Sequence, residues 1–264
     1  MLPIHVINLA RAPDRLDRIG RALDAAGLSW RRVEALDRRA IPPGELRAAF
    51  GEGPLSRAYP ATPGDMACSL THHRLWDVIA GGTAAAAVVL EDDARLGAGF
   101  AAFVEDGMAG LMRDHAMEVL KLEFWPGSAR SRRLPVGQPL GGGPAGTRLY
   151  RLRSGFLGTC GYVLTARGAE ALLRHFPVPA VPVDHLLFGR SAGMGFDLLR
   201  PGFVNPAPVL HDIDSFASDI RPERPQVSGR TLRRRWRDWR TRRAEAAEVR
   251  AGLAVPVAMT FADA

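Results

Sequence analysis

The chain has 264 residues, 47% hydrophobic and 24% charged, which suits one large globular α/β domain and excludes a largely disordered protein. Its formal net charge of +7 is concentrated in residues 221–250, where eleven arginines accompany four carboxylates, so the rest of the chain is nearly neutral. The two cysteines exclude a disulfide framework, and no apolar run reaches the roughly 18 residues of a membrane span. With no signal peptide expected in residues 2–9, we expect free thiols and a cytoplasmic location.

The chain opens with a predicted strand at residues 4–9 and a predicted helix at residues 13–26 with one apolar face. Asn8, Arg11 and Arg15 cluster around the carboxyl end of this strand, where two guanidiniums and an amide suit the base, ribose or diphosphate of a nucleotide. The alternative is that both arginines are solvated helix residues.

A short strand at residues 31–35 precedes a Pro-, Gly- and Ala-rich stretch at residues 37–63, for which we expect loop and short helix. Helical spacing of apolar residues then predicts a helix over residues 64–79 that places His72 on the buried face. A histidine there is either a hydrogen-bonded core residue or a ligand-binding group. Asp65 near the helix start is a candidate cap.

An apolar run at residues 84–90 ends abruptly in Glu91, Asp92 and Asp93. Small and β-branched residues without polar interruption predict a strand buried on both faces of a mostly parallel sheet. Adjacent carboxylates repel one another unless a cation or a proton intervenes, and hard oxygen ligands suit Mg²⁺ or Mn²⁺ shared with substrate phosphates. The alternative is that one acid caps the next helix and the others are solvated.

A predicted helix at residues 100–112 is followed by a predicted strand at residues 118–124, which carries the only lysine of the chain, Lys121. This lysine either orients carboxylates or phosphates or is an exposed strand residue. Residues 127–147 are rich in Gly, Pro and Arg and suggest a mobile flap over a site. Residues 149–153 alternate as an exposed strand does.

A glycine-containing strand is predicted within residues 155–164, followed by a helix over residues 165–175 that Thr165 caps. The Pro-rich link at residues 177–183 brings Asp184 to the start of another helix, residues 185–190. An acid in this position is either an N-cap or a group that points into the cleft.

Two final strands are predicted at residues 196–199 and 204–210, with prolines that favour sheet edges. His211 opens a polar loop, residues 211–220, that could close over the site. His211 itself is either a metal or phosphate contact or a surface histidine.

The C-terminal segment, residues 221–264, forms an Arg-rich tail in which Leu232, Trp236 and Trp239 follow i, i+4, i+7 spacing. A basic amphipathic helix with tryptophans on one side suits an anionic membrane surface. Nucleic acid would also attract such a tail. The remaining alternative is that the tryptophans pack onto the domain and the arginines are solvated.

Several short motifs recur in this order in one known family, although each is weak alone. They are Asn8-Leu9 with Arg11 and Asp14-Arg15, residues 64–76, residues 89–93, Gly158-Thr159 with Gly161-Tyr162, residues 182–184 and residues 218–220. Together these motifs, which cover about residues 4–220, resemble glycosyltransferase family 25, the bacterial lipooligosaccharide glycosyltransferases that also include collagen galactosyltransferase domains. The chain departs from the family pattern at Asp65, Ala67, Thr71 and His211, which affects substrate details more than chemical type.

The resemblance implies a GT-A-like fold with a mixed, mostly parallel central sheet flanked by helices, an inverting transfer, a UDP-sugar donor such as UDP-galactose, and a divalent ion, Mn²⁺ or Mg²⁺. Asp93 would bind the metal with His211, and Asp184 would be the catalytic base that accepts the proton of the acceptor hydroxyl. The residues assigned to the donor are Asn8, Arg11, Arg15, His72, Glu91, Asp92 and Lys121.

We therefore predict a glycosyltransferase domain at residues 1–220, acting on a glycan acceptor in lipopolysaccharide or lipooligosaccharide biosynthesis, and a tail at residues 221–264. The tail would attach the enzyme peripherally to the inner face of the cytoplasmic membrane, and we do not expect nucleic acid as its partner. One alternative is a metal-dependent nucleotidyl- or phosphotransferase, for which the chain lacks a P-loop. The other is a non-enzymatic protein that binds anionic surfaces through the tail.

Overall fold

The computed structural model describes residues 1–125, 134–212 and 232–263. Within them the elements follow in the order β1 (Ile4–Asn8), α1 (Pro13–Ala25), β2 (Trp30–Glu34), α2 (Pro43–Ala49), α3 (Pro54–Ala58), α4 (Pro63–Ala80), β3 (Ala86–Glu91), β4 (Ala94–Leu96), the 3₁₀ turn η1 (Phe100–Phe103), α5 (Gly107–Asp114), β5 (Val119–Lys121), β6 (Glu123–Phe124), β7 (Val136–Gly142), the 3₁₀ turn η2 (Pro144–Gly146), β8 (Arg148–Leu152), β9 (Gly161–Thr165), α6 (Ala166–His175), α7 (Val183–Phe188), α8 (Met194–Leu199), β10 (Gly202–Asn205), β11 (Val209–His211), α9 (Leu232–Arg250) and β12 (Val255–Pro256).

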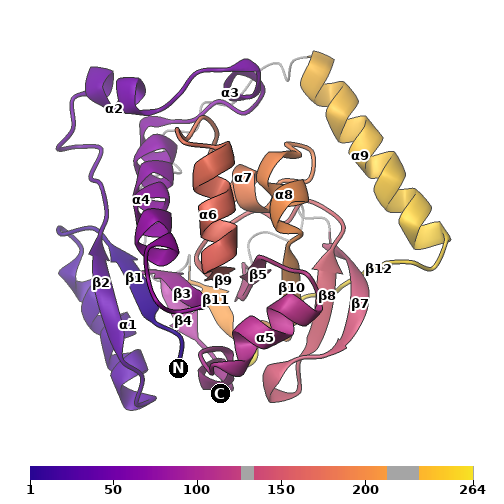
Figure 1. Cartoon of the computed structure of the whole chain (residues 1–264), viewed down its shortest axis with the longest axis horizontal. Coiled ribbons are helices and arrows are strands. Elements are labelled where there is room, and N and C mark those ends of the chain that lie inside the picture. Colours follow the sequence, from indigo (N-terminus) through magenta and orange to yellow (C-terminus); the bar gives the residue numbers. More distant parts are fainter. Residues whose placement is uncertain (126–133, 213–231, 264) are drawn as a thin grey trace.

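In the described part of the chain, nine strands form one large sheet in the order β12-β7-β8-β10-β5-β9-β3-β1-β2 (Figure 1). Three of its neighbouring pairs are parallel and five are antiparallel. The prediction of a mostly parallel sheet is therefore wrong. β9 lies antiparallel between β3 and β5, and a strand buried on both faces has the same apolar pattern whichever way its neighbours run.

Helices cover both faces of the large sheet, so that β3 is buried on both sides as predicted. Ala87 and Val89 face one apolar cluster, built with α4, α6, α7 and α8. Val88 and Leu90 face a second cluster, built with α1, η1 and α5. Because both faces of β3 are covered by packed helices, the carboxylates that follow it have fixed positions.

A second, three-stranded sheet with the order β4-β11-β6 lies at the end of the large one. Each of its strands follows closely on a strand of the large sheet: β4 follows β3, β6 follows β5, and β11 follows β10. Asp92 and Asp93 occupy the junction between β3 and β4, and Leu122 alone separates β5 from β6. The junction between β3 and β4 thus carries two of the predicted site residues, Asp92 and Asp93.

The described elements differ from the sequence predictions in several segments. Two predicted strands divide between the two sheets: residues 118–124 give β5 and β6, and residues 204–210 give parts of β10 and β11. Residues 196–199 belong to helix α8, because a short apolar run does not distinguish a buried helix from a strand. Residues 100–112 divide into η1 and α5. Residues 127–147, expected to be a loop, contain strand β7 and turn η2, although residues 126–133 lie outside the described part. Strand β8, expected to be exposed, is largely buried between β7 and β10.

The C-terminal segment contributes helix α9, which runs along one side of the molecule, and strand β12, which pairs with β7 (Figure 1). The predicted boundary at residue 220, and most of the loop predicted at residues 211–220, lie outside the described residues. No helix in the described ranges is long and apolar enough to cross a membrane.

Candidate active site

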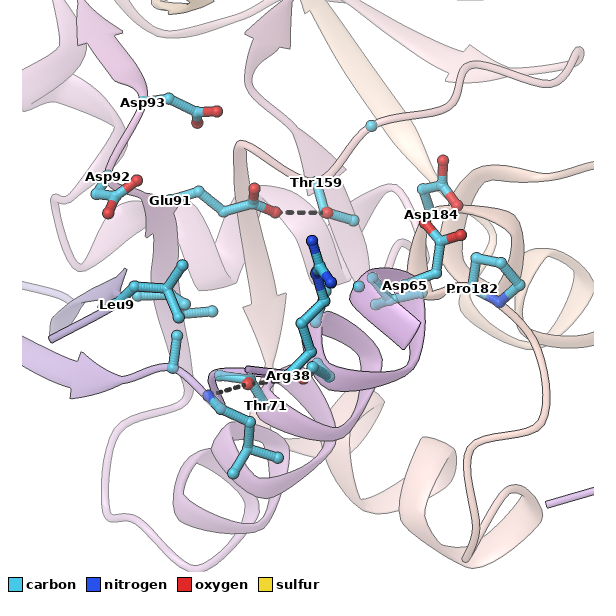
Figure 2. Close-up of a pocket in the computed structure, with 18 of the residues that line it drawn as sticks. Leu9, Arg38, Asp65, Thr71, Glu91, Asp92, Asp93, Thr159, Pro182 and Asp184 are labelled. Carbon is cyan, nitrogen blue, oxygen red and sulfur yellow. Dashed lines mark hydrogen bonds between the residues drawn. The ribbon is translucent and has the colours of Figure 1, made fainter. Parts of the chain in front are cut away.

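A pocket opens where β1 and β3 end and where α4 and α7 begin (Figure 2). Seven of the residues predicted for the site line it together: Arg11, Arg15, Glu91, Asp92, Asp93, Asp184 and His211. The other three, Asn8, His72 and Lys121, are buried behind this lining. The prediction that ligand-binding side chains gather at the carboxyl end of the acidic strand is consistent with this geometry.

Asp92 is held in place by groups from the first β-α unit. The Asn8 side chain donates from Nδ2 to Asp92 Oδ2 at 2.8 Å, and Arg15 Nη1 lies 3.4 Å from Asp92 Oδ1. Arg32 Nε in turn donates to Asn8 Oδ1 at 3.0 Å. Burial raises the pKa of Asp92, the charge of Asp93 raises it further, and the hydrogen bonds from Asn8 and Arg15 oppose this rise. Asn8 therefore positions a pocket carboxylate and does not itself line the pocket.

Glu91 ends a buried chain of hydrogen bonds that begins on α4. Trp76 Nε1 donates to the Tyr162 hydroxyl at 3.1 Å, and that hydroxyl lies 2.8 Å from His72 Nδ1. If the tyrosine donates to Nδ1, neutral His72 carries its proton on Nε2 and donates it to Glu91 Oε1, 3.3 Å away. Thr159 Oγ1 donates to the same oxygen at 2.7 Å. His72 is fully buried and contacts Glu91, so it supports this carboxylate from behind and does not itself line the pocket.

Asp93 and His211 contact each other in the lining of the pocket, with 2.9 Å between Asp93 Oδ2 and His211 Nε2. Burial alone would lower the pKa of His211, but Asp93, followed by Glu123 and Glu91, raises it to about 9. Burial alone would raise the pKa of Asp93, but the hydrogen bond and charge of His211 bring it below its ordinary value. At neutral pH the pair is thus a carboxylate beside an imidazolium.

The same pair has the donor atoms of a metal site, namely a carboxylate oxygen and an imidazole nitrogen. Metal-binding histidines usually direct their other ring nitrogen toward a carboxylate, and His211 Nδ1 lies 4.0 Å from Glu123 Oε2. A mixed nitrogen and oxygen set suits Mn²⁺ better than Mg²⁺, which prefers oxygen ligands. These residues therefore fit a divalent ion that would replace the proton of His211.

Lys121 lies beneath the pocket, only 1% exposed, and its ammonium contacts the Glu123 carboxylate. It also donates to the Gly158 carbonyl at 2.6 Å and lies 4.5 Å from the centre of the Phe188 ring. Of the two predicted roles for Lys121, orienting a carboxylate matches this geometry, and the exposed strand residue is wrong. Its partner Glu123, which also accepts from the Cys160 amide at 3.1 Å, was missed.

Glu123 is buried beneath the pair of Asp93 and His211 and is therefore part of the candidate site. Burial raises its pKa, while the charges of Lys121 and His211 lower it. A signal was available in the sequence: Lys121 and Glu123 are two residues apart on a predicted strand, so their side chains share one face. A lone lysine and a glutamate on the same face of a buried strand are expected to pair.

Asp184 lines the pocket from the first turn of α7, where its Oδ1 accepts from the His185 amide at 2.7 Å. The start of α7 is fastened to α4, because Val183 N donates to Ser69 Oγ at 3.0 Å. Ser69 Oγ donates in turn to the Asp65 carbonyl at 2.6 Å. These bonds place Asp184 across the pocket from Asp92 and Asp93, with Glu91 between them (Figure 2).

Three other charged residues of the lining were not predicted as site residues. Asp65 closes a capping box with Thr62, which confirms it as a cap, but it also lines the pocket beside Asp184 (Figure 2). Asp37 pairs with Arg11 at 2.7 Å, and Arg38 extends into the pocket below Glu91 and Thr159 (Figure 2). Asp37 and Arg38 follow β2 in a loop that has no periodic pattern to identify it.

A second group with potential ligand atoms, Cys68, His72 and Glu91, lies within 4.8 Å but does not have the properties of a metal site. Burial raises the pKa of the Cys68 thiol well above its ordinary value, and nearby carboxylates add to this, so it is not a thiolate at neutral pH. Both ring nitrogens of His72 are occupied by Tyr162 and Glu91.

Comparisons with known proteins support a relationship across most of this chain. The model of a family described as Glycosyltransferase family 25 (LPS biosynthesis protein) matches residues 1–187. Procollagen galactosyltransferase 1 of Danio rerio is 27% identical over 190 residues, or 70% of this chain, and the chain spans only 30% of its length. The lacto-N-neotetraose biosynthesis glycosyltransferase LgtB of Neisseria gonorrhoeae is 29% identical over 223 residues, which cover 78% of this chain and 74% of LgtB.

A third relative, from Bos taurus, is named a probable inactive glycosyltransferase 25 family member 3 and is 28% identical over 193 residues, covering 70% of this chain and 31% of its own length. Similarity at this level therefore includes a protein named as inactive.

Proposed function

The chain belongs to glycosyltransferase family 25, and from this premise we propose that it is a metal-dependent, inverting glycosyltransferase with a GT-A-like fold. It moves a sugar, with galactose as the first choice, from a UDP-sugar to a hydroxyl of a glycan acceptor in lipopolysaccharide or lipooligosaccharide synthesis. The choice of galactose follows the names of the procollagen galactosyltransferases, and the choice of glycan follows the family description and the name of LgtB.

One observation carries this proposal: Asp92 and Asp93 lie on one side of the pocket and Asp184 lies on the other. Asp92 and Asp93 lie beside cationic groups, namely Arg15 and His211. Asp184 lies across the pocket from them (Figure 2). Displacement with inversion requires such a separation, because the leaving group departs from the face opposite the attacking hydroxyl.

On the leaving-group side, Arg15 and the Asp93–His211 pair line one wall of the pocket. Arg15 binds an oxygen of the donor diphosphate through its guanidinium. Asp93 and His211 would hold the divalent ion, and the ion would neutralise charge that develops on the departing diphosphate. Asp92 and Glu91, fixed by Asn8 and Thr159, orient the donor ribose or the groups around the ion.

On the attacking side, Asp184 accepts the proton of the acceptor hydroxyl as that oxygen bonds to the anomeric carbon. A general base needs a fixed position within hydrogen-bond reach of the proton it takes. The contact of Val183 with Ser69 provides the fixed position, and the exposed part of Asp184 faces the pocket.

Two variants with one control test the assignment. Asp184→Asn should abolish transfer while UDP-sugar binding, measured by calorimetry with Mn²⁺, survives. Asp93→Ala should remove Mn²⁺-dependent UDP binding. Asp197→Asn, an exposed acid of α8 outside the pocket lining, should change neither.

A screen of UDP-, GDP- and CMP-sugars with Mn²⁺ identifies the donor, and release of free UDP is the expected signal. Release of pyrophosphate would instead assign the site to nucleotidyl transfer. Normal Mn²⁺-dependent UDP binding by Asp93→Ala would refute the metal assignment.

A further inference from the structure

Helix α9 has an outer face that is strongly basic and partly aromatic. We define this outer face by the exposed residues of α9, which include Leu232, Trp236 and Trp239, exposed by 80%, 55% and 52%. The same face carries six exposed arginines: Arg233, Arg235, Arg240, Arg242, Arg243 and Arg250. Every residue of α9 is described, and none of its carboxylates lies on this face.

The acidic residues of α9 lie on the opposite, half-buried face, which contacts the body of the protein. Glu248 pairs with Arg190 at 2.6 Å, and Arg234 Nη1 donates to the Ala58 carbonyl at 2.9 Å. This arrangement reverses the usual amphipathic pattern, in which a surface helix packs its aromatic residues inward. Sequence periodicity alone left open whether the tryptophans pack onto the domain, and here they are half exposed.

We propose that the outer face of α9 binds an anionic phospholipid bilayer. Tryptophan indoles favour the headgroup region of a membrane, where the ring is partly apolar and its N–H can be hydrated. The arginines supply charge complementary to anionic lipid headgroups. Arg240 and Arg243 lie 4.6 Å and 4.9 Å from the centres of the Trp236 and Trp239 rings, so charge and aromatic surface reach the headgroup region together.

Nucleic acid is a weaker match for this face. Stacking proteins offer aromatic rings to bases along a groove, whereas these rings lie on a convex helix and are already covered on one side by arginines. Two tryptophans and a leucine on the same helix face match an interfacial membrane helix.

The position of α9 also relates the bilayer to the proposed catalytic base, and this step rests on the proposed function. Arg234 at the beginning of α9 lies 4.7 Å from the centre of the Tyr59 ring, and that ring lies 4.8 Å from the ring of His185. His185 directly follows Asp184. The beginning of α9 is thus linked by two contacts to α7, the helix that carries Asp184, and we infer that a glycan carried by a membrane lipid enters the pocket from this side.

Co-sedimentation of the full chain with vesicles tests the proposal. We expect binding to phosphatidylcholine vesicles that contain phosphatidylglycerol, little binding to phosphatidylcholine alone, and weaker binding as salt increases. Arg233→Gln/Arg242→Gln should weaken the apparent Kd about 25-fold, since each basic residue near the surface contributes roughly fivefold. Trp236→Ala/Trp239→Ala should weaken it roughly tenfold.

The matched control is Arg21→Gln/Arg174→Gln, which removes the same charge from exposed positions of α1 and α6 and should change the Kd less than about twofold. Equal losses in both arginine pairs would show a net-charge effect and overturn the proposal. Failure to bind the mixed vesicles, with binding of a single-stranded oligonucleotide instead, would also overturn it. Turnover of a water-soluble acceptor should be unchanged in the α9 variants. This assay measures glycosyl transfer independently of membrane binding, so the two proposals can fail separately.

Discussion

Replacing Lys121 by methionine separates two roles for this residue, binding of the donor and support of Glu123. Methionine keeps much of the apolar volume of the lysine side chain beside Phe188, so the change mainly removes the charge. Glu123, which is 1% exposed, then loses the positive charge that lies beside it in the native protein. We expect the free energy of unfolding to fall.

The magnitude follows from the burial of both partners. Breaking a buried ion pair by removing one member costs about 3–5 kcal/mol, and both side chains are only 1% exposed, so solvent screening reduces this little. At about 2–4 °C per kcal/mol for a protein of this size, the Tm should fall by roughly 6–20 °C. Lys121→Met/Glu123→Gln removes the stranded charge and should recover a large part of this loss.

Urea unfolding of wild type, both single variants and the double variant gives the coupling energy between the two residues. A loss below about 1 kcal/mol for Lys121→Met, or no recovery in the double variant, would refute the buried-pair interpretation. If Lys121→Met instead weakened UDP-sugar binding at unchanged stability, the donor-binding role predicted from the sequence would hold.

Two further predictions concern the pair of Asp93 with His211 and the fastening of Asp184. Because the pKa of His211 is raised from 6.5 to about 9, the stability that its charged form contributes is complete below pH 6.5 and is lost as the pH rises through about 9. In urea unfolding without divalent ions, His211→Gln should therefore lower the free energy of unfolding by up to about 3 kcal/mol more at pH 6 than at pH 10. A loss that does not depend on pH would contradict this. Ser69→Ala leaves the Val183 amide without its acceptor and should lower the free energy of unfolding by about 1–3 kcal/mol. Because Asp184 then loses its fixed position, kcat for transfer should fall while the donor Kd stays unchanged. An unchanged kcat would argue against a positioning role for Ser69.

The sequence predicted those parts of the fold whose pattern has a single interpretation. β1 and α1 match residues 4–9 and 13–26 closely, because Pro13 suits a first helical turn and the apolar residues keep one face. Strand direction was not predictable, since burial on both faces leaves the same run of residues in parallel and antiparallel sheets. Residues 196–199 were assigned to a strand because four apolar residues fit either element.

For the candidate site, the sequence predicted which functional side chains lie near one another, but not which of them line the pocket and which are buried behind it. Glu91, Asp92, Asp93 and Asp184 line one pocket as their places after a strand and before a helix indicated. His72 was correctly placed on a buried face, but whether it meets ligand or protein depends on Tyr162, which is distant in sequence. Arg38 escaped notice because its loop has no period, so only the folded chain shows where it points.

The seam between the two sheets makes the complete pocket depend on both of them. Lys121 ends β5 in the large sheet and Glu123 begins β6 in the small one, and the acids after β3 lie at a second junction of this kind. A chain with only one sheet assembled would hold half of each pair and no complete site. Ligand binding is therefore a stringent check on refolded or redesigned versions of this protein, because it reports the docking of both sheets, which total helix or strand content would not.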